Sequence, residues 1–169
     1  GRVVADYARA FGMEVVWWSS EAGRARAEAD SETVPESRAA FFGTCDVVSL
    51  HLRLTSETRG SVTADDLGAM PPRSVLVNTS RAGLIAEGAL LQALNAGDLG
   101  AAAVDVFDTE PLTDPNDPLL SHPKLIATPH IGFVTEDEFD KQFADIFEQV
   151  NAYAAGDPIH MINPSVYAP

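Results

Sequence analysis

Lysine is scarce in this chain of 169 residues, and acidic side chains outnumber basic ones. Lys and Arg total 11 against 25 Asp and Glu, which gives a net charge of −14. Nucleic-acid binding needs clustered cations that neutralise phosphates, and peripheral membrane binding often uses a polybasic patch. The lysines are Lys124 and Lys141 alone. We therefore expect neither nucleic acid nor a membrane as a partner.

The sequence also lacks paired cysteines and long apolar runs. Cys45 is the single cysteine, so it cannot form an intrachain disulfide, and its place close to Val47 and Val48 predicts a buried, inert thiol. No apolar run approaches the about 20 residues that a membrane-spanning helix needs. The N-terminus has none of the regions of a secretory signal. These absences predict a soluble, cytoplasmic protein.

Short apolar runs alternate with segments in which apolar residues have helical spacing. The runs predicted as strands are 13–18, 46–52, 74–78, 101–106 and 125–128. The segments predicted as helices are 2–11, 34–43, 63–70, 86–96 and 135–155, and the polar stretch 21–36 is predicted as a surface excursion. Thr63 and Asp66 form an approximate capping box. The alternation predicts an α/β fold, a Rossmann-type doubly wound parallel sheet with crossover helices on both faces.

Polar side chains follow each predicted strand, at the edge of a parallel sheet where ligands bind. They are Ser19, Ser20, His51, Thr79, Ser80, Arg81, Asp105 with Glu110 a few residues on, and His130. An arginine, a carboxylate and a histidine at one edge suit the reduction of a 2-keto acid or the oxidation of a 2-hydroxy acid. The guanidinium of Arg81 can grip a substrate carboxylate, and His130 can exchange a proton near neutral pH. Glu110 can fix the imidazole tautomer and favour its charged form.

Each of these residues, taken alone, also has a purely structural interpretation. His130 could cap the strand end before it, Arg81 could form a surface ion pair, and Glu110 could be an ordinary turn carboxylate. His51 is surrounded by an apolar strand, so it suits a hydrogen-bonded core histidine as well as a cofactor neighbour.

Four segments resemble the NAD-binding domain of the D-isomer-specific 2-hydroxyacid dehydrogenases in order, spacing and context. They are DVVSLHL (46–52), LVNTSRAG (76–83), AAVDVFDTEPL (102–112) and ATPHIG (127–132), and the resemblance covers essentially the whole chain. It implies that Arg81 binds the substrate carboxylate, that His130 is the acid/base paired with Glu110, and that Asp105 contacts the nicotinamide amide. It further implies NAD or NADP as cofactor, a small 2-hydroxy or 2-keto acid as substrate, and a homodimer, with no metal.

The expected cofactor-binding residues lie along the same sheet edge and at the start of the chain. They are Gly1, Ser19, Ser20, His51, Leu52, Thr79, Ser80, Arg81, Asp105, His130 and Gly132. Many relatives carry an acidic residue where this chain has Ser19, so the choice between NAD and NADP stays open. Arg24 or Arg26 could reach a 2′-phosphate, although a solvated surface is the alternative for both.

Gly1 resembles the third glycine of the family's GxGxxG fingerprint, although a cloning remnant is the alternative. The first strand, the first two glycines and the N-terminal substrate domain would precede it. We therefore expect a fold truncated at its N-terminus, with a dinucleotide-binding domain over 1–155 and a tail over 156–169 that would return to the substrate domain. Such a fragment should be inactive alone, because the catalytic cleft needs two walls. A nucleotide-sensing interaction module without turnover is the alternative function, and a structural dimerisation remnant is a third.

Overall fold

The computed structural model describes residues 1–167 of the protein. It consists of two compact units, the first from Gly1 to His130 and the second beginning at Ile131. The dinucleotide-binding domain expected over 1–155 therefore includes the first unit and the long helix of the second. Its boundary at residue 155 stays a prediction.

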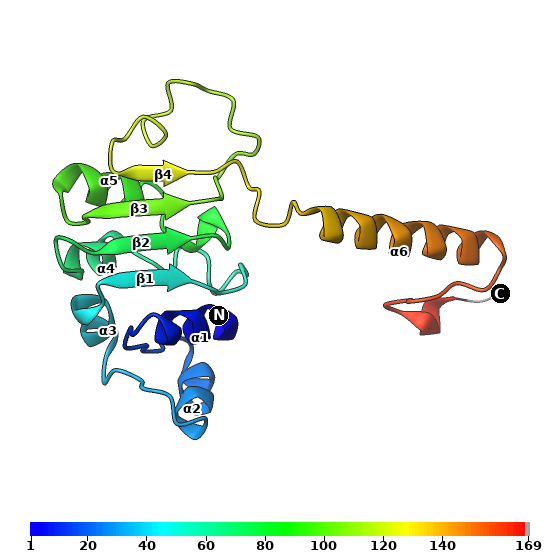
Figure 1. Cartoon of the computed structure of the whole chain (residues 1–169), viewed down its shortest axis with the longest axis horizontal. Coiled ribbons are helices and arrows are strands. Elements are labelled where there is room, and N and C mark those ends of the chain that lie inside the picture. Colours follow the sequence, from blue (N-terminus) through cyan, green and yellow to red (C-terminus); the bar gives the residue numbers. More distant parts are fainter. Residues whose placement is uncertain (168–169) are drawn as a thin grey trace. The chain divides into compact units, whose positions relative to one another are not determined.

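A four-stranded parallel sheet forms the centre of the first unit (Figure 1). Its strands stand side by side in chain order: β1 (Val47–Leu50), β2 (Val75–Asn78), β3 (Ala101–Val104) and β4 (Leu125–Ala127). Leu50 pairs with Asn78, and Asn78 pairs with Val104. The carboxyl ends of all four strands therefore lie at one edge, as the sequence predicted for an α/β fold of this class.

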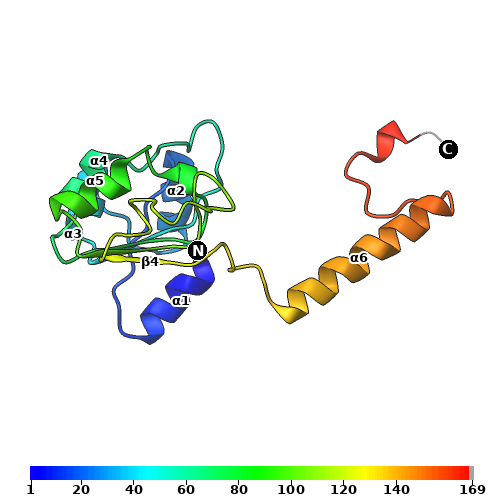
Figure 2. The same cartoon turned by 90° about the horizontal axis from the view of Figure 1, so that it is seen from above.

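Helices lie on both sides of the sheet of the first unit. Those of this unit are α1 (Arg2–Ala10), α2 (Glu21–Ala29), α3 (Arg38–Thr44), α4 (Ala64–Ala69), α5 (Ala89–Ala96) and the 3-10 turn η1 (Ala82–Leu84). Figure 2 shows α3, α4 and α5 on one side of the sheet and α1 on the other. The expected placement of helices on both faces is thus confirmed.

The hydrophobic core lies between the sheet and the helices α3, α4 and α5. Alternate strand residues point into it, as the two-residue period of a strand requires. Leu76 and Leu67 are fully buried there, and Val48 is 2% exposed. On the opposite face the strand residues are more exposed, with Val47 at 47% and Ile126 at 69%.

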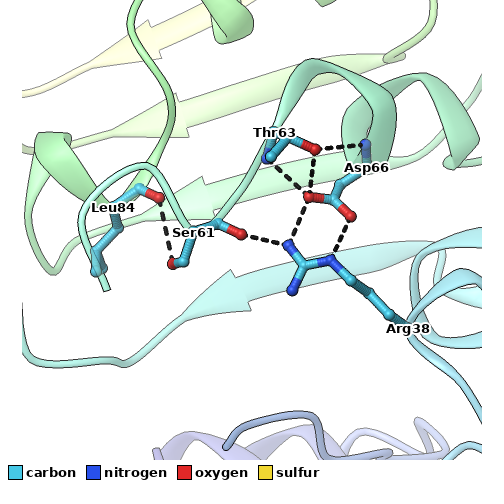
Figure 3. A network of polar contacts seen from close by, with 5 residues as sticks. All are labelled: Arg38, Ser61, Thr63, Asp66 and Leu84. Atoms are coloured by element: carbon cyan, nitrogen blue, oxygen red, sulfur yellow. Dashed lines mark hydrogen bonds and ion pairs between the residues drawn. The ribbon is translucent and has the colours of Figure 1, made fainter. Parts of the chain in front are cut away.

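A polar network fastens α3 to the start of α4 (Figure 3). The Thr63 hydroxyl accepts a hydrogen bond from Asp66 N, while the Asp66 carboxylate accepts one from Thr63 N at 2.7 Å, so the predicted capping box is confirmed. Arg38 donates from Nε and Nη2 to the two Asp66 carboxylate oxygens at 2.6 Å each. Arg38 also donates to the carbonyl of Ser61. One aspartate therefore caps α4 and holds the cation of α3.

One prediction for the N-terminal region is wrong. Residues 13–18 are extended but do not join the sheet: a single parallel bridge links Val16 to Thr33. A strand needs a neighbour along its length to complete its ladder of hydrogen bonds, and the described residues supply this segment with only the bridge at Thr33. The stretch 21–36, predicted as a surface excursion, has no buried residue and contains α2, whose apolar residues are small alanines.

Cys45 is a free, partly buried cysteine. Burial raises the pKa of its thiol, with a smaller contribution from the negative charge of Asp46. The thiol is therefore protonated at neutral pH, in agreement with the inert state expected from the sequence.

The second unit contains the helix α6 (Glu136–Ala154) and a short 3-10 turn, η2 (Pro164–Val166). Thr135 caps α6 through its hydroxyl, which accepts a hydrogen bond from Glu138 N. The rings of Phe139 and Phe143 lie 4.4 Å apart between centroids, so apolar side chains form a row along the helix. Within residues 1–167, no helix has the length and apolar content to cross a bilayer.

Candidate active site

The polar residues predicted to share one edge of the sheet do follow the carboxyl ends of its strands. β1 leads to His51 and Leu52, β2 leads to the segment Thr79–Arg81, and β3 leads directly to Asp105. The start of α1 lies at the same edge, where the chain begins in Figure 1. A side-chain carbon added to Gly1 would lie 3.4 Å from Cβ of His51. Such a carbon would make an ordinary van der Waals contact, so the start of α1 lies next to the end of β1.

Glu110 and His130 form the central contact of the site. Nδ1 of His130 lies 2.6 Å from Oε2 of Glu110. The other carboxylate oxygen accepts a hydrogen bond from Phe107 N at 2.8 Å. The hydrogen bond to His130 is the main cause that lowers the pKa of Glu110, followed by the bond from Phe107. The carboxylate is therefore ionised across the neutral range and faces an imidazole that it can stabilise in the protonated form.

The backbone of His130 has a left-handed conformation, with φ of 54°. Residues other than glycine rarely adopt this region, because the Cβ atom is crowded there, at a cost of about 1–2 kcal/mol. His130 N donates to the Thr128 carbonyl at 3.0 Å, which closes the tight turn after β4. The turn thus aims the imidazole at Glu110, 20 residues away in the chain.

Arg81 follows a turn that Asn78 organises. The buried amide of Asn78 donates to the Arg81 carbonyl at 2.9 Å and accepts from Ser80 N at 3.0 Å. Nη1 of Arg81 then donates to the Ser80 carbonyl at 2.6 Å, while the rest of the exposed guanidinium is open to solvent. The positive charge of Arg81 also contributes to the lowered pKa of Glu110. Arg81 and Glu110 therefore follow neighbouring strands whose carboxyl ends meet at one edge of the sheet.

Asp105 and Ser80 are held beside this group. Asp105 is 4% exposed and accepts a hydrogen bond from the Thr128 hydroxyl. Ser80 donates its hydroxyl to the Leu52 carbonyl at 2.7 Å, which joins the loops that follow β1 and β2. Sequence reasoning did not identify Asn78 or Thr128 as part of the site. The sequence signal that could have identified them is their position within the segments LVNTSRAG and ATPHIG, close to the predicted residues.

The other predicted residues have simpler surroundings. His51 is exposed, and its Nε2 lies 2.9 Å from the Ser49 hydroxyl, so it is not a core histidine. Partial removal of its ring from water lowers its pKa. Thr79 is exposed, and Ser20 caps α2. Gly132 belongs to the second unit, so its part in the site stays a prediction.

The residues of the first unit fit a dinucleotide. A helix N-terminus beside Gly1 suits a diphosphate, and a buried carboxylate at the end of β3 suits an amide donor. Among residues 1–167, no group of three or more His, Cys, Asp or Glu side chains is placed to hold a metal ion. The site offers a planar cation, an imidazole and a carboxylate at the ligand-binding edge of the sheet.

The fold and this edge define a dinucleotide-binding α/β domain of the Rossmann class. The model of the family described as D-isomer specific 2-hydroxyacid dehydrogenase, NAD binding domain, matches residues 1–132. The chain therefore belongs to this family, as the four segments of the sequence indicated.

The relatives and solved structures that this chain resembles are named after several different substrates. The chain is 34% identical over 169 residues to a glyoxylate reductase of Aeropyrum pernix, covering 98% of this chain and 49% of that protein. It is 35% identical to a D-3-phosphoglycerate dehydrogenase of Bacillus subtilis, covering 94% of this chain and 30% of that protein. The crystal structure of a phosphoglycerate oxidoreductase from Vibrio cholerae superimposes with a TM-score of 0.86 and 42% identity, over 92% of this chain and 50% of that one. The chain thus spans half or less of the length of these relatives.

Proposed function

We propose that the protein containing this chain transfers a hydride between a nicotinamide cofactor, NAD or NADP, and a small 2-hydroxy or 2-keto acid. The observation that carries the proposal is the 2.6 Å contact between Glu110 and His130, with Arg81 close enough to affect the same carboxylate. When bound, the nicotinamide supplies the hydride to the second carbon of a 2-keto acid. The residues of this chain then have to bind the acid, orient its carbonyl and deliver one proton.

Each of the three side chains has a separate part in that task. Arg81 binds the substrate carboxylate through the open side of its fork and stabilises the negative charge that develops on the carbonyl oxygen. His130, protonated and stabilised by Glu110, donates its proton to that oxygen from Nε2, because Nδ1 faces the carboxylate. In the oxidative direction the neutral imidazole takes the hydroxyl proton back. Asp105 holds the amide of the nicotinamide ring.

Replacement of the acid/base tests the proposal. In the full-length protein, His130→Ala should lower kcat by about 100-fold or more, since general acid–base catalysis contributes about 10²–10⁴-fold. The Kd for the dinucleotide should change little, because proton donation is not part of cofactor binding. His122→Ala is the matched control, since His122 lies before β4 and contacts only the local backbone. Turnover of His130→Ala at the unaltered rate would remove the assignment.

Several features of the whole protein belong to the same proposal. The 169-residue chain alone should bind a dinucleotide weakly and show negligible turnover, because the second wall of the cleft would come from a substrate domain. A homodimer is expected from the family resemblance, and a cytoplasmic location is expected from the single cysteine and from the apolar runs, which are too short to span a membrane. Tight dinucleotide binding by the full-length protein without turnover on any small 2-keto acid would instead favour the nucleotide-sensing alternative.

A further inference from the structure

The side chain of Arg24, in the first turn of α2, is held by Trp18 and Ser19, and it has no ionic partner among the described residues. Its guanidinium carbon lies 4.4 Å from the ring centroid of Trp18, and Nη1 donates to the Ser19 carbonyl at 2.7 Å. The ring of Trp18, on which the guanidinium of Arg24 lies, is the platform for Arg24. Trp18 stacks in turn on Phe41 of α3, with ring centroids 6.1 Å apart. Among residues 1–167, no carboxylate lies within ion-pair distance of Arg24.

The chain has 25 acidic residues and a net charge of −14, and three of its nine arginines pair with a carboxylate among the described residues. Arg2, Arg9 and Arg38 each pair with a carboxylate. Arg24 is immobilised by a ring and a carbonyl instead, and one of its five N–H donors is used. Arg81 has the same pattern, since its Nη1 donates to the Ser80 carbonyl. Nη1 of each arginine thus donates to a serine carbonyl, and most N–H donors of both guanidinium groups have no hydrogen-bond partner among the described residues.

Arg24 donates to the carbonyl of Ser19, and the position of Ser19 in the chain is the one that corresponds to the adenosine end of a Rossmann site. In a Rossmann domain, the residue about 20 positions after the glycine turn contacts the ribose 2′-hydroxyl, and a nearby arginine accommodates a 2′-phosphate. Ser19 stands at that position relative to Gly1. Gly1 also lies next to the ring of Trp17: a carbon added to Gly1 would be 3.6 Å from it. The start of α1 and the segment that carries Ser19 are therefore neighbours in space.

Ser19 and Ser20 offer hydroxyls where a carboxylate would favour NAD. Ser20 caps α2, whose nine residues direct their first amides toward this loop. Gly23 leaves room for Ser19, because a side-chain carbon there would lie 2.6 Å from the Ser19 hydroxyl oxygen. Glu21 is the acidic residue nearest in sequence, and it is exposed at the first position of α2.

We propose that the protein prefers NADP(H) to NAD(H), because Arg24 and the hydroxyls of Ser19 and Ser20 bind the 2′-phosphate of the adenosine ribose. This inference rests on the proposed dinucleotide-binding function. A phosphate monoester carries a charge of about −1.5 to −2 at pH 7, and a planar guanidinium binds it with charge-assisted hydrogen bonds. The fixed position of Arg24 means that little side-chain freedom is lost on binding.

The test compares dinucleotide affinities of the full-length protein by titration with NADPH and NADH. The natural protein should bind NADPH more tightly. Arg24→Ala should raise the Kd for NADPH by about 10–100-fold and change the Kd for NADH by less than about threefold. Arg73→Ala is the control, because Arg73 is an exposed arginine before β2, at the opposite end of the strand from the ligand-binding edge, and it should leave both values unchanged. The probes 2′-AMP and 5′-AMP isolate the phosphate contact, and 2′-AMP should lose affinity in Arg24→Ala.

Two further variants keep the test informative if Arg24→Ala destabilises the platform on Trp18. Arg24→Lys keeps the charge without the planar fork, so it should lose part of the NADPH preference. Ser19→Asp should reverse the preference, because a carboxylate repels the phosphate and accepts the 2′-hydroxyl of NADH. Equal affinity for NADPH and NADH in the natural protein would overturn this inference alone. Failure of both dinucleotides to bind would overturn it together with the proposed function.

Discussion

The two faces of the four-stranded sheet differ in how completely the rest of the first unit buries them. Neighbouring residues of β1 show the contrast, since Val48 is 2% exposed under the helices and Val47 is 47% exposed on the other face. On that second face Ile126 of β4 is 69% exposed. Parallel sheets are normally buried on both faces, so their strands are apolar throughout. The exposed apolar residues of this second, open face are therefore typical of a sheet face that normally packs against another layer.

The residues that stabilise the fold are therefore different from the residues of the candidate site. The covered face supplies the apolar burial, and the site residues lie at the carboxyl edge between the faces. Site side chains such as Arg81 and Glu110 are exposed and contribute little to the core. Changes on the covered face, the open face and the edge should therefore have distinct consequences.

The largest expected effect is on the covered face. Leu76→Ala should lower the free energy of unfolding by about 2–5 kcal/mol, because Leu76 is 0% exposed and its removal leaves a cavity in the core. Ile126→Ala, on the open face, should cost less than about 1 kcal/mol. Urea unfolding of both variants followed by circular dichroism measures the difference. Equal losses would show that the two faces are equally covered in solution.

A smaller effect is expected from the network that fastens α3 to α4. Asp66→Asn should lower the free energy of unfolding by about 1–2 kcal/mol at pH 7, since it weakens the helix cap and the bidentate bond from Arg38. Hydrogen bonds from Arg38 and Thr63 lower the pKa of Asp66 against the opposing effect of burial.

The sign of the pH dependence follows from that shift. A lowered folded-state pKa stabilises the protein above the unfolded-state pKa of Asp, about 3.9, and the contribution is lost as the pH falls through the folded-state value. The gap between the natural protein and Asp66→Asn should therefore narrow in acid. Asp65→Asn is the control, because Asp65 lies in the same turn without an ion pair among the described residues. A gap that is constant from pH 7 to pH 3 would contradict the role of the charge.

Several strands and helices could be predicted well because their signals are local. The runs 74–78 and 125–128 contain β2 and β4, and the segment 135–155 contains α6 with one residue to spare at each end. The pair Thr63 and Asp66 identified the start of α4 because a capping box needs only residues three apart. Apolar periodicity and helix capping depend on residues that are close together in the chain, so they can be recognised from the sequence alone.

The N-terminal region was harder because its structure depends on distant partners. The run 13–18 has the composition of a buried strand, but pairing decides whether such a run becomes one. α2 lacks an apolar stripe, and its start is marked only by Ser20. The contact of Glu110 with His130 was predicted from the family resemblance, whereas the supporting bonds of Asn78 and Thr128 depend on side-chain geometry that spacing does not encode.

The smallest effect on stability is expected at the edge, where Glu110→Gln should change the pH profile and leave the midpoint of thermal unfolding unaltered. The hydrogen bond from His130 lowers the pKa of Glu110, so an ionised carboxylate faces Nδ1 of His130 at neutral pH. Reductive turnover needs the protonated form of His130 and declines as the pH rises. Without the negative charge, the decline should begin at lower pH, and oxidative turnover should rise at lower pH as well. Glu87→Gln is the control, since Glu87 is an exposed carboxylate before α5. A pH profile that does not move in Glu110→Gln would separate Glu110 from the proton transfer and leave it as a structural partner of His130.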